Sequence, residues 1–140
     1  MLEEGRAQQP YRARYVQTFT VNKLVEIGTR VFVGAGAPAP IAKRVAYSLV
    51  LSNLMGVDSH GVIRIPQYLK EIEAGGIVPD AEPVIVRDNG VAVLMDGQNA
   101  FGQIVAERAM RLAIERARKH TIGLVSFAHV LHIGRLGEWA

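Results

Sequence analysis

The spacing of the apolar residues changes partway along this 140-residue chain, and this change limits the possible folds more than any other feature. In residues 20–76 the apolar residues recur every three or four positions, as in amphipathic helices. After residue 83, short runs rich in valine and isoleucine come before and after a second helical pattern. The sequence therefore predicts an α/β fold in which an N-terminal helical subdomain precedes the start of a sheet domain.

Three helices are expected in the helical subdomain. They cover residues 20–32, 39–55 and 66–74. Thr20 is a suitable N-cap for the first helix, and Gly34 ends it. Pro40 lies in the first turn of the second helix, where proline is tolerated. Pro66 is expected to hold Ile65 outside helical geometry.

A hairpin and one further strand are expected in the second part of the chain. Asn89-Gly90 lies between the β-branched runs 84–86 and 91–95, which is a strong hairpin signal. A helix over 103–119 and a strand over 122–128 follow, and this order predicts a right-handed crossover to a parallel strand. Because so few strands make an incomplete sheet, we expect further strands and interpret the sheet as cut short. The expected divisions are a flexible lead-in over 1–19, a helical subdomain over 20–76, and the truncated start of an α/β domain over 77–140.

Composition excludes several classes of protein. The chain has no cysteine, which rules out a disulfide-stapled fold, a zinc ribbon and a thiol nucleophile. A cytoplasmic location is compatible with that count and is what we expect. The net charge of +3 is too small for the cationic surface of a nucleic-acid-binding protein. Uncharged runs at 31–42 and 45–57 are shorter than the ~20 residues of a membrane span, so no membrane partner is expected.

Three weaker patterns favour structural interpretations. The segment from Gly34 to Ala39 fits the loose dinucleotide-loop pattern G-x-G-x-x-A, but Pro38 and Pro40 remove N–H groups that a phosphate would need. We therefore interpret it as a corner between two helices. His129 and His132 have metal-ligand spacing but no evident third ligand, so no metal is expected. The basic residues of the predicted helix 103–119 indicate a solvated face.

A dense polar cluster, Asp58-Ser59-His60-Gly61, is followed by Arg64 in an otherwise apolar stretch. If the turn is helical, His60 and Arg64 lie on one face. An imidazole exchanges protons near neutral pH, and a guanidinium can hold a carboxylate with two hydrogen bonds. This pair suits reduction of a 2-oxo acid. From the residues alone, an N-cap aspartate beside a structural histidine is at least as good an explanation, and a second cluster after the last strand, 132–137, is weak by itself.

Taken in order, the motifs resemble the malate/L-lactate dehydrogenase family of the non-Rossmann type, over about residues 20–140. The matching residues are Gly56-Val57-Asp58-Ser59-His60-Gly61-Val62-x-Arg64-x-Pro66-x-Tyr68, Gly75-Gly76-Ile77-x-Pro79, Asp96-Gly97, Gly102, Ala109-Met110-x-x-Ala113-Ile114-x-x-Ala117 and His132-x-Gly134. The string Arg135-Leu136-Gly137-Glu138 is similar to the hydroxycarboxylate dehydrogenase branch. Other members act as ureidoglycolate, sulfolactate and diketogulonate enzymes.

The resemblance implies an oxidoreductase that uses NAD or NADP to interconvert small 2-oxo and 2-hydroxy acids. It also implies a three-layer α/β/α mixed-sheet domain distinct from the Rossmann fold, and a homodimer with its active site between domains. His60 and His132 would be the active-site histidines, with the choice of proton donor left open. Ser59 and Arg64 would bind the substrate. His60 and the segment Gly134-Arg135-Leu136 would lie near the cofactor.

Two departures from the family leave an alternative open. Family members are much longer, and their usual Ser-Asn before the second histidine is Val130-Leu131 here. The first interpretation is therefore an incomplete copy of a dehydrogenase. The alternative is a non-catalytic, truncated interaction module that dimerises through an unpaired sheet edge.

Overall fold

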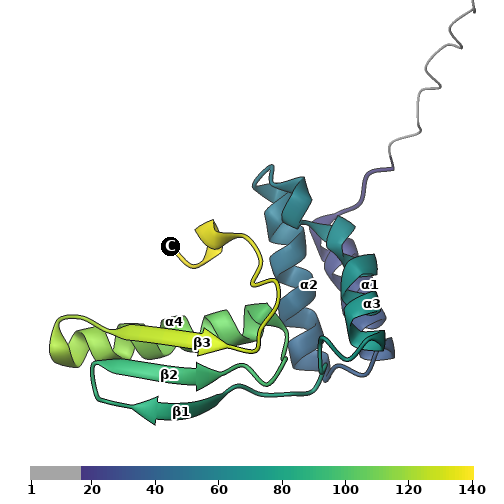
Figure 1. The fold of residues 1–140 in the computed structure, drawn as a ribbon. Coiled ribbons are helices and arrows are strands. Elements are labelled where there is room, and N and C mark those ends of the chain that lie inside the picture. The colour runs from purple at the N-terminus through teal and green to yellow at the C-terminus, as the bar shows by residue number, and fades with distance from the viewer. Residues whose placement is uncertain (1–16) are drawn as a thin grey trace, which may run out of the picture.

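A computed structural model describes residues 17–140 (Figure 1). Three helices come first, and a three-stranded sheet with one long helix follows them. The expected lead-in over 1–19 lies outside the described residues as far as residue 16. Within the described part of the chain, no helix is long and apolar enough to cross a membrane.

The helical part consists of α1 (Val21–Gly34), α2 (Ala39–Leu54) and α3 (Ile65–Glu73). The predicted N-cap is confirmed, since the Thr20 side chain accepts a hydrogen bond from the Lys23 backbone N–H. Because α1 continues through Gly34 and α2 begins at Ala39, the glycine-rich segment is a helix–helix corner, as expected. Two short 3₁₀ turns, Asp58–His60 and Val62–Arg64, join α2 to α3.

Two of the predicted boundaries are wrong. Ile65 has helical angles (φ −53°, ψ −49°) and begins α3, because the preceding 3₁₀ turn already sets the helical direction. The last strand begins at Leu124 rather than at residue 122. Gly123 packs against the backbone of α4 at Ala113, and Thr121 has a positive φ of 75°, so the chain turns here before it extends.

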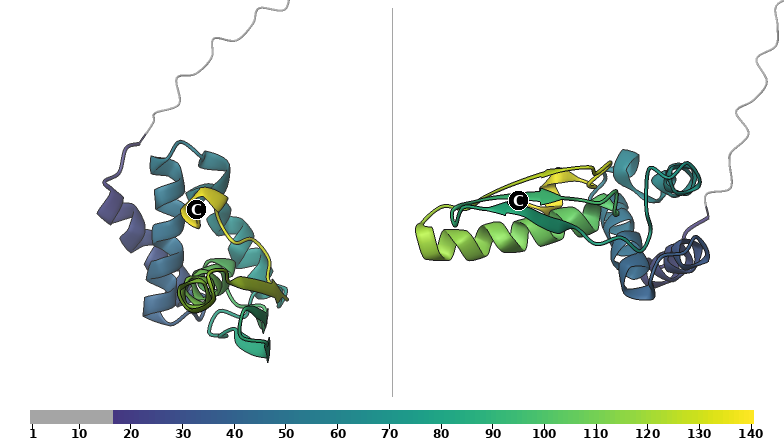
Figure 2. Two further views of the ribbon diagram at one scale, coloured as in Figure 1. Left: turned by 90° about the vertical axis from the view of Figure 1, so that its left-hand side faces the viewer. Right: turned by 60° about the horizontal axis from the view of Figure 1, so that its bottom comes forward.

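The sheet contains β1 (Val84–Asp88), β2 (Ala92–Asp96) and β3 (Leu124–Ala128), in the order β1-β2-β3. β1 and β2 form the predicted antiparallel hairpin, whereas β3 pairs parallel to β2 after the crossover through α4 (Gly102–His120). α4 lies along one face of this mixed sheet, and the helices α1–α3 stand at its end (Figures 1 and 2). The predicted fold class, a helical region followed by the start of an α/β domain, is confirmed.

Two apolar clusters stabilise these parts. The first joins the three N-terminal helices and includes Phe32, Leu49, Tyr68 and Phe101. The second joins α4 to the sheet through Val93, Met95 and Ala109, with Val125 and Phe127 packed beside them. Phe101 precedes α4 and belongs to the first cluster, so the N-terminal end of α4 is held against the helices. This junction positions the candidate site.

Candidate active site

The polar cluster predicted from the sequence forms the two 3₁₀ turns between α2 and α3. Asn53, at the end of α2, holds both turns: its Nδ2 donates to Asp58 Oδ1 (2.6 Å), and its Oδ1 accepts from the Val62 backbone N–H (2.9 Å). Gly61 lies directly against the Asn53 side chain, and any β-carbon at this position would overlap it. The two hydrogen bonds of Asn53 therefore hold both turns. Gly61 lies between the turns, and a larger residue at this position would displace the Asn53 side chain.

Ser59, His60 and Arg64 are tied together within these turns. The Ser59 hydroxyl lies 3.0 Å from His60 Nδ1, so His60 is held through one ring nitrogen. Arg64 Nε donates to the Ser59 carbonyl oxygen (2.6 Å), and Arg64 Nη1 donates to Gln67 Oε1 (2.6 Å). These bonds orient the guanidinium toward the same turn as the imidazole.

His132 reaches this cluster from the loop that follows β3. Its ring centroid lies 5.1 Å from that of His60, although the two residues are far apart in the sequence. Its Nδ1 lies 2.6 Å from the hydroxyl of Tyr68 on α3. The fold thus brings Ser59, His60, Arg64 and His132 together; the sequence pattern indicated the first three as one cluster, and His132 was implied only by the family resemblance.

Two residues of this cluster had no role in the sequence analysis. Tyr68 is 2% exposed and Gln103, at the start of α4, is fully buried. Gln103 Nε2 donates to the Tyr68 hydroxyl (2.7 Å), which in turn contacts His132. Tyr68 was part of the matched motif without a stated role. For Gln103 the available signal was an amide on the apolar face of an amphipathic helix, where a polar side chain needs a partner.

Burial shifts the pKa values of the two groups that contact each other. Burial lowers the pKa of His132, and the positive charges of Arg64 and His60 lower it further. Burial also raises the pKa of Tyr68 to about 12. At neutral pH His132 is therefore neutral and Tyr68 keeps its proton.

A hollow of about 230 Å³ lies beside His132. Its lining combines Tyr68, His132, Ile77 and Leu131 with the polar side chains of Gln67 and Glu71. Its size suits a molecule of a few carbon atoms rather than a drug-sized ligand. Leu131 and Ile77 contribute the apolar part of this lining.

The segment Gly134-Arg135-Leu136 packs against α2 and α4. Gly134 (φ +85°) is buried against Ser48 and Gln103. Arg135 Nε is buried and has no hydrogen-bond partner within the described residues. Leu136 lines a separate apolar hollow of about 160 Å³ with Met110, Phe127 and Trp139. Arg135 is not among the residues that line this hollow.

The C-terminal turn that follows this segment is anchored to α2. Glu138 accepts hydrogen bonds from Arg44 Nη2 (2.7 Å) and from the Ser48 hydroxyl (2.6 Å). Arg44 also lies under the Trp139 ring, 5.4 Å from its centroid. Burial lowers the pKa of Arg44, but its hydrogen bonds to Glu107 and Glu138 more than offset this effect and raise the pKa above its ordinary value. The loop that carries His132 is therefore fixed at its C-terminal side as well.

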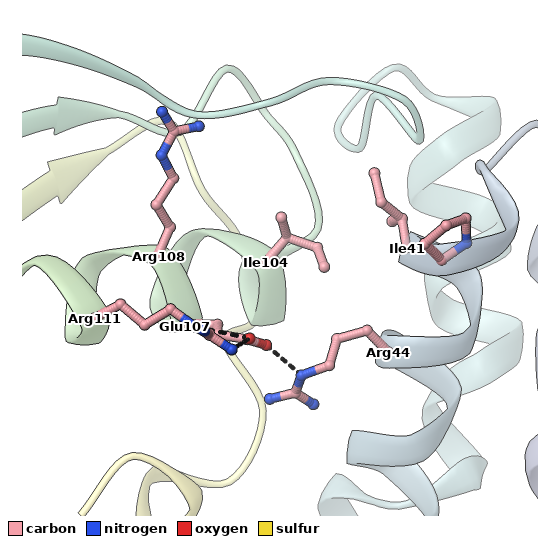
Figure 3. Close-up of a pocket in the computed structure, with 7 residues that line it drawn as sticks. Ile41, Arg44, Ile104, Glu107, Arg108 and Arg111 are labelled. Atoms are coloured by element: carbon pink, nitrogen blue, oxygen red, sulfur yellow. Dashed lines mark hydrogen bonds and ion pairs between the residues drawn. The ribbon is translucent and has the colours of Figure 1, made fainter.

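A larger hollow of about 360 Å³ lies between α2 and α4 (Figure 3). Its charged groups bind one another, since Glu107 accepts from both Arg44 and Arg111. Neither His60 nor His132 lines this hollow. We interpret this hollow as part of the contact between α2 and α4 rather than as a reaction site.

The other sequence patterns lie apart from the histidine cluster. His129 Nδ1 donates a hydrogen bond to the Asp96 carboxylate (2.9 Å), a partner different from that of His132. Among the described residues, no group of three side chains could hold a metal ion. On the basic helix α4, Arg111 and Lys119 form ion pairs with acidic residues one turn earlier.

Comparison with known proteins gives consistent matches. The family model described as malate/L-lactate dehydrogenase matches residues 19–140. The chain is 43% identical over 110 residues to hydroxycarboxylate dehydrogenase B of Escherichia coli O157:H7, covering 79% of this chain and 30% of that protein. It is 40% identical over 119 residues to malate dehydrogenase of Pyrococcus abyssi, covering 85% and 33%.

The fold has a solved counterpart as well. The structure of malate dehydrogenase from Pyrococcus horikoshii OT3 superposes with a TM-score of 0.84 at 34% identity, covering 100% of this chain and 39% of that chain. The chain spans about a third of the length of the curated relatives it matches.

Proposed function

Because this chain belongs to the malate/L-lactate dehydrogenase family, we propose that it carries part of the active site of an oxidoreductase that interconverts small 2-oxo and 2-hydroxy acids with NAD or NADP. The observation that carries this proposal is the contact between His60 and His132, with Arg64 held in the same turns as His60 and His132 lining a small hollow. A guanidinium and two imidazoles in one place provide an anchor for a carboxylate and a proton source for a carbonyl oxygen.

Arg64 is proposed to bind the substrate carboxylate, with Ser59 beside it. Its Nε and Nη1 already hold the turn, which keeps the guanidinium oriented before substrate arrives. One histidine, His60 or His132, supplies a proton to the substrate oxygen. Because Arg64 and the histidine are already oriented, little free energy is spent on reorienting them during the reaction.

The nicotinamide cofactor is proposed to lie against His60 and the segment Gly134-Arg135-Leu136. When bound, it supplies or accepts the hydride at the substrate carbon. The apolar hollow that Leu136 and Trp139 line supports a place for the flat part of such a molecule, and Arg135, which does not line that hollow, would have to reorient its guanidinium to bind a charged part.

A second candidate function, a non-catalytic module that self-associates, is favoured by the surface of the sheet. Val84, Ile85 and Val86 on the edge strand β1 are all exposed. Leu94 and Leu124 are also exposed. An apolar edge strand is a common site of pairing between chains. The family resemblance also implies a homodimer, so self-association alone does not separate the two candidates.

Substitution of Arg64 tests the first proposal. We expect Arg64→Ala to raise KM for a 2-oxo acid by roughly 30-fold or more, because an arginine–carboxylate pair contributes about 2–4 kcal/mol to binding. A neutral ketone of similar size should be little affected. The measurement is the oxidation of NADH followed by absorbance, with Arg118→Ala on the exposed end of α4 as the matched control.

Equal effects on both substrates would contradict the anchor role. Failure of the unsubstituted chain to turn over any 2-oxo acid, together with self-association in sedimentation, would favour the second candidate.

A further inference from the structure

A buried line of three side chains connects the start of α4 to the second histidine. Gln103 Nε2 lies 2.7 Å from the Tyr68 hydroxyl, and this hydroxyl lies 2.6 Å from His132 Nδ1. Gln103 and Tyr68 are almost completely buried. Water therefore does not compete for these bonds, and the direction of each one affects the next.

The direction of the bonds follows from the number of protons available. The Tyr68 hydroxyl has one proton, and its pKa of about 12 keeps that proton in place at neutral pH. The hydroxyl oxygen accepts from the Gln103 amide, and its proton has two acceptors in reach, His132 Nδ1 at 2.6 Å and the His132 carbonyl oxygen at 3.5 Å. The much shorter contact directs the proton to His132 Nδ1. His132 Nδ1 is then an acceptor, and the single proton of the neutral imidazole lies on Nε2.

The opposite direction is less favourable. If the Gln103 amide were turned over, its oxygen would accept from Tyr68, and its NH₂ group would be buried with no acceptor. The arrangement in the structure leaves only Gln103 Oε1 without a partner among the described residues. A buried carbonyl oxygen without a partner is tolerated better than a buried N–H donor.

His132 lines the small hollow, and its other ring nitrogen takes no part in the bond to Tyr68. Nε2 is buried and has no hydrogen-bond partner within the described residues. An unsatisfied buried donor costs about 1–3 kcal/mol, which a substrate oxygen would recover by accepting from it. The groups that surround the ring are His60, Arg64 and Glu71, the last across the small hollow.

We propose that Tyr68 and Gln103 are positioning residues that hold His132 in the tautomer protonated at Nε2, so that its N–H hydrogen-bonds the substrate oxygen without giving up the proton. A neutral imidazole that lost this proton would become an anion, unless Tyr68 lost its own proton to Nδ1. Both outcomes are unfavourable at neutral pH. The proton that the oxygen takes up then comes from His60, which is held at Nδ1 by Ser59.

The catalytic role given to this N–H rests on the proposed function, but the tautomer of His132 can be measured without any substrate. Long-range ¹H–¹⁵N NMR spectra of the full chain, labelled at its four histidines, report which nitrogen carries the proton. His132→Gln identifies the His132 signals by their loss. We expect a single His132 tautomer at neutral pH, protonated at Nε2.

Tyr68→Phe removes only the hydroxyl. We expect the ratio of the two His132 tautomers to shift toward Nδ1–H by about three- to tenfold, the value of one ordinary hydrogen bond. In NADH oxidation, the same variant should lower kcat about tenfold with little change in KM, because the N–H acts on charge that develops in the transition state. Tyr47→Phe, the same change at an exposed position on α2, is the matched control and should alter neither signal.

Gln103→Glu supplies a second test in the same direction, because it should also favour the Nδ1–H tautomer. A carboxylate at this position would accept the Tyr68 proton, so the tyrosine oxygen would accept from Nδ1–H and the tautomer would reverse. A wild-type His132 protonated at Nδ1, or a tautomer ratio that Tyr68→Phe leaves unchanged, would overturn the inference. Correct tautomers in a chain without dehydrogenase activity would instead refute only the proposed function.

Discussion

Gly102 begins α4 without a side chain, and the carbonyl oxygen of His132 occupies the space where a β-carbon would lie. The same β-carbon would stand 2.9 Å from Cα of Ile133, closer than atoms of this kind approach. The loop after β3 therefore crosses the start of α4 in direct backbone contact. This contact, together with the Tyr68 hydrogen bond, determines where the second histidine lies.

Gly102→Ala is expected to destabilise the protein by about 1–3 kcal/mol, because the added methyl group must displace the loop backbone. The displacement should also change the NMR signals of His132. Gly34→Ala is the matched control: it lies in α1 with open space around the added atom, and helix propensity predicts a gain of up to about 1 kcal/mol. The measurement is urea denaturation of both variants, and equal stability changes would contradict this account.

At the scale of the elements, local signals predicted each helix and strand but placed some ends poorly. The N-cap of α1 and the hairpin at Asn89-Gly90 depend on neighbouring residues only, and both are confirmed. The start of β3 depends on how Gly123 packs against α4, which is a contact between distant residues. The start of α3 depends on the 3₁₀ turns that Asn53 holds from α2.

The N-cap of α1 provides a test at this scale. Thr20→Ala removes the acceptor for the Lys23 backbone N–H and should lower the free energy of unfolding by about 1 kcal/mol. Thr20→Ser keeps the hydroxyl and should have little effect. Denaturant unfolding measures the loss, and faster amide exchange at Lys23 would localise it. A loss of the same size in both variants would show that the methyl group, not the cap, is responsible.

At the scale of the whole molecule, several shifted pKa values affect stability in the same direction. Hydrogen bonds from the Gln98 backbone and from His129 lower the pKa of Asp96. Burial raises the pKa of Glu107, but hydrogen bonds from Arg44 and Arg111 outweigh it and lower the pKa overall. The pKa of His132 is also lowered, by burial and by nearby positive charge. For each of these groups, the unfolded chain binds protons more readily than the folded chain does.

The folded protein should therefore lose stability as pH falls. His132 begins to contribute to this loss below its ordinary value of 6.5, because protonation then favours the unfolded chain. Glu107 stabilises fully above its ordinary value of 4.5, and its contribution is lost as pH falls through its lower folded value. Urea denaturation between pH 7 and pH 3, followed by fluorescence of the single tryptophan, measures the effect.

Glu107→Gln is the control for the acid part of this curve. It should flatten the dependence below pH 4.5 and leave the part near pH 6 unchanged. Stability that is constant or that rises toward acid pH would contradict the assigned shifts.

The sequence by itself determined the order of helices and strands, the class of fold and the candidate residues Ser59, His60 and Arg64. These features depend on periodicity, turn residues and short spacing, which act between neighbours in the chain. Only the tertiary structure decided that His132 joins them, that Gly134 and Leu136 turn toward other surfaces, and that Tyr68 and Gln103 contact the histidine. The reason is that these contacts join α3, α4 and the loop after β3, and their geometry depends on how those elements pack.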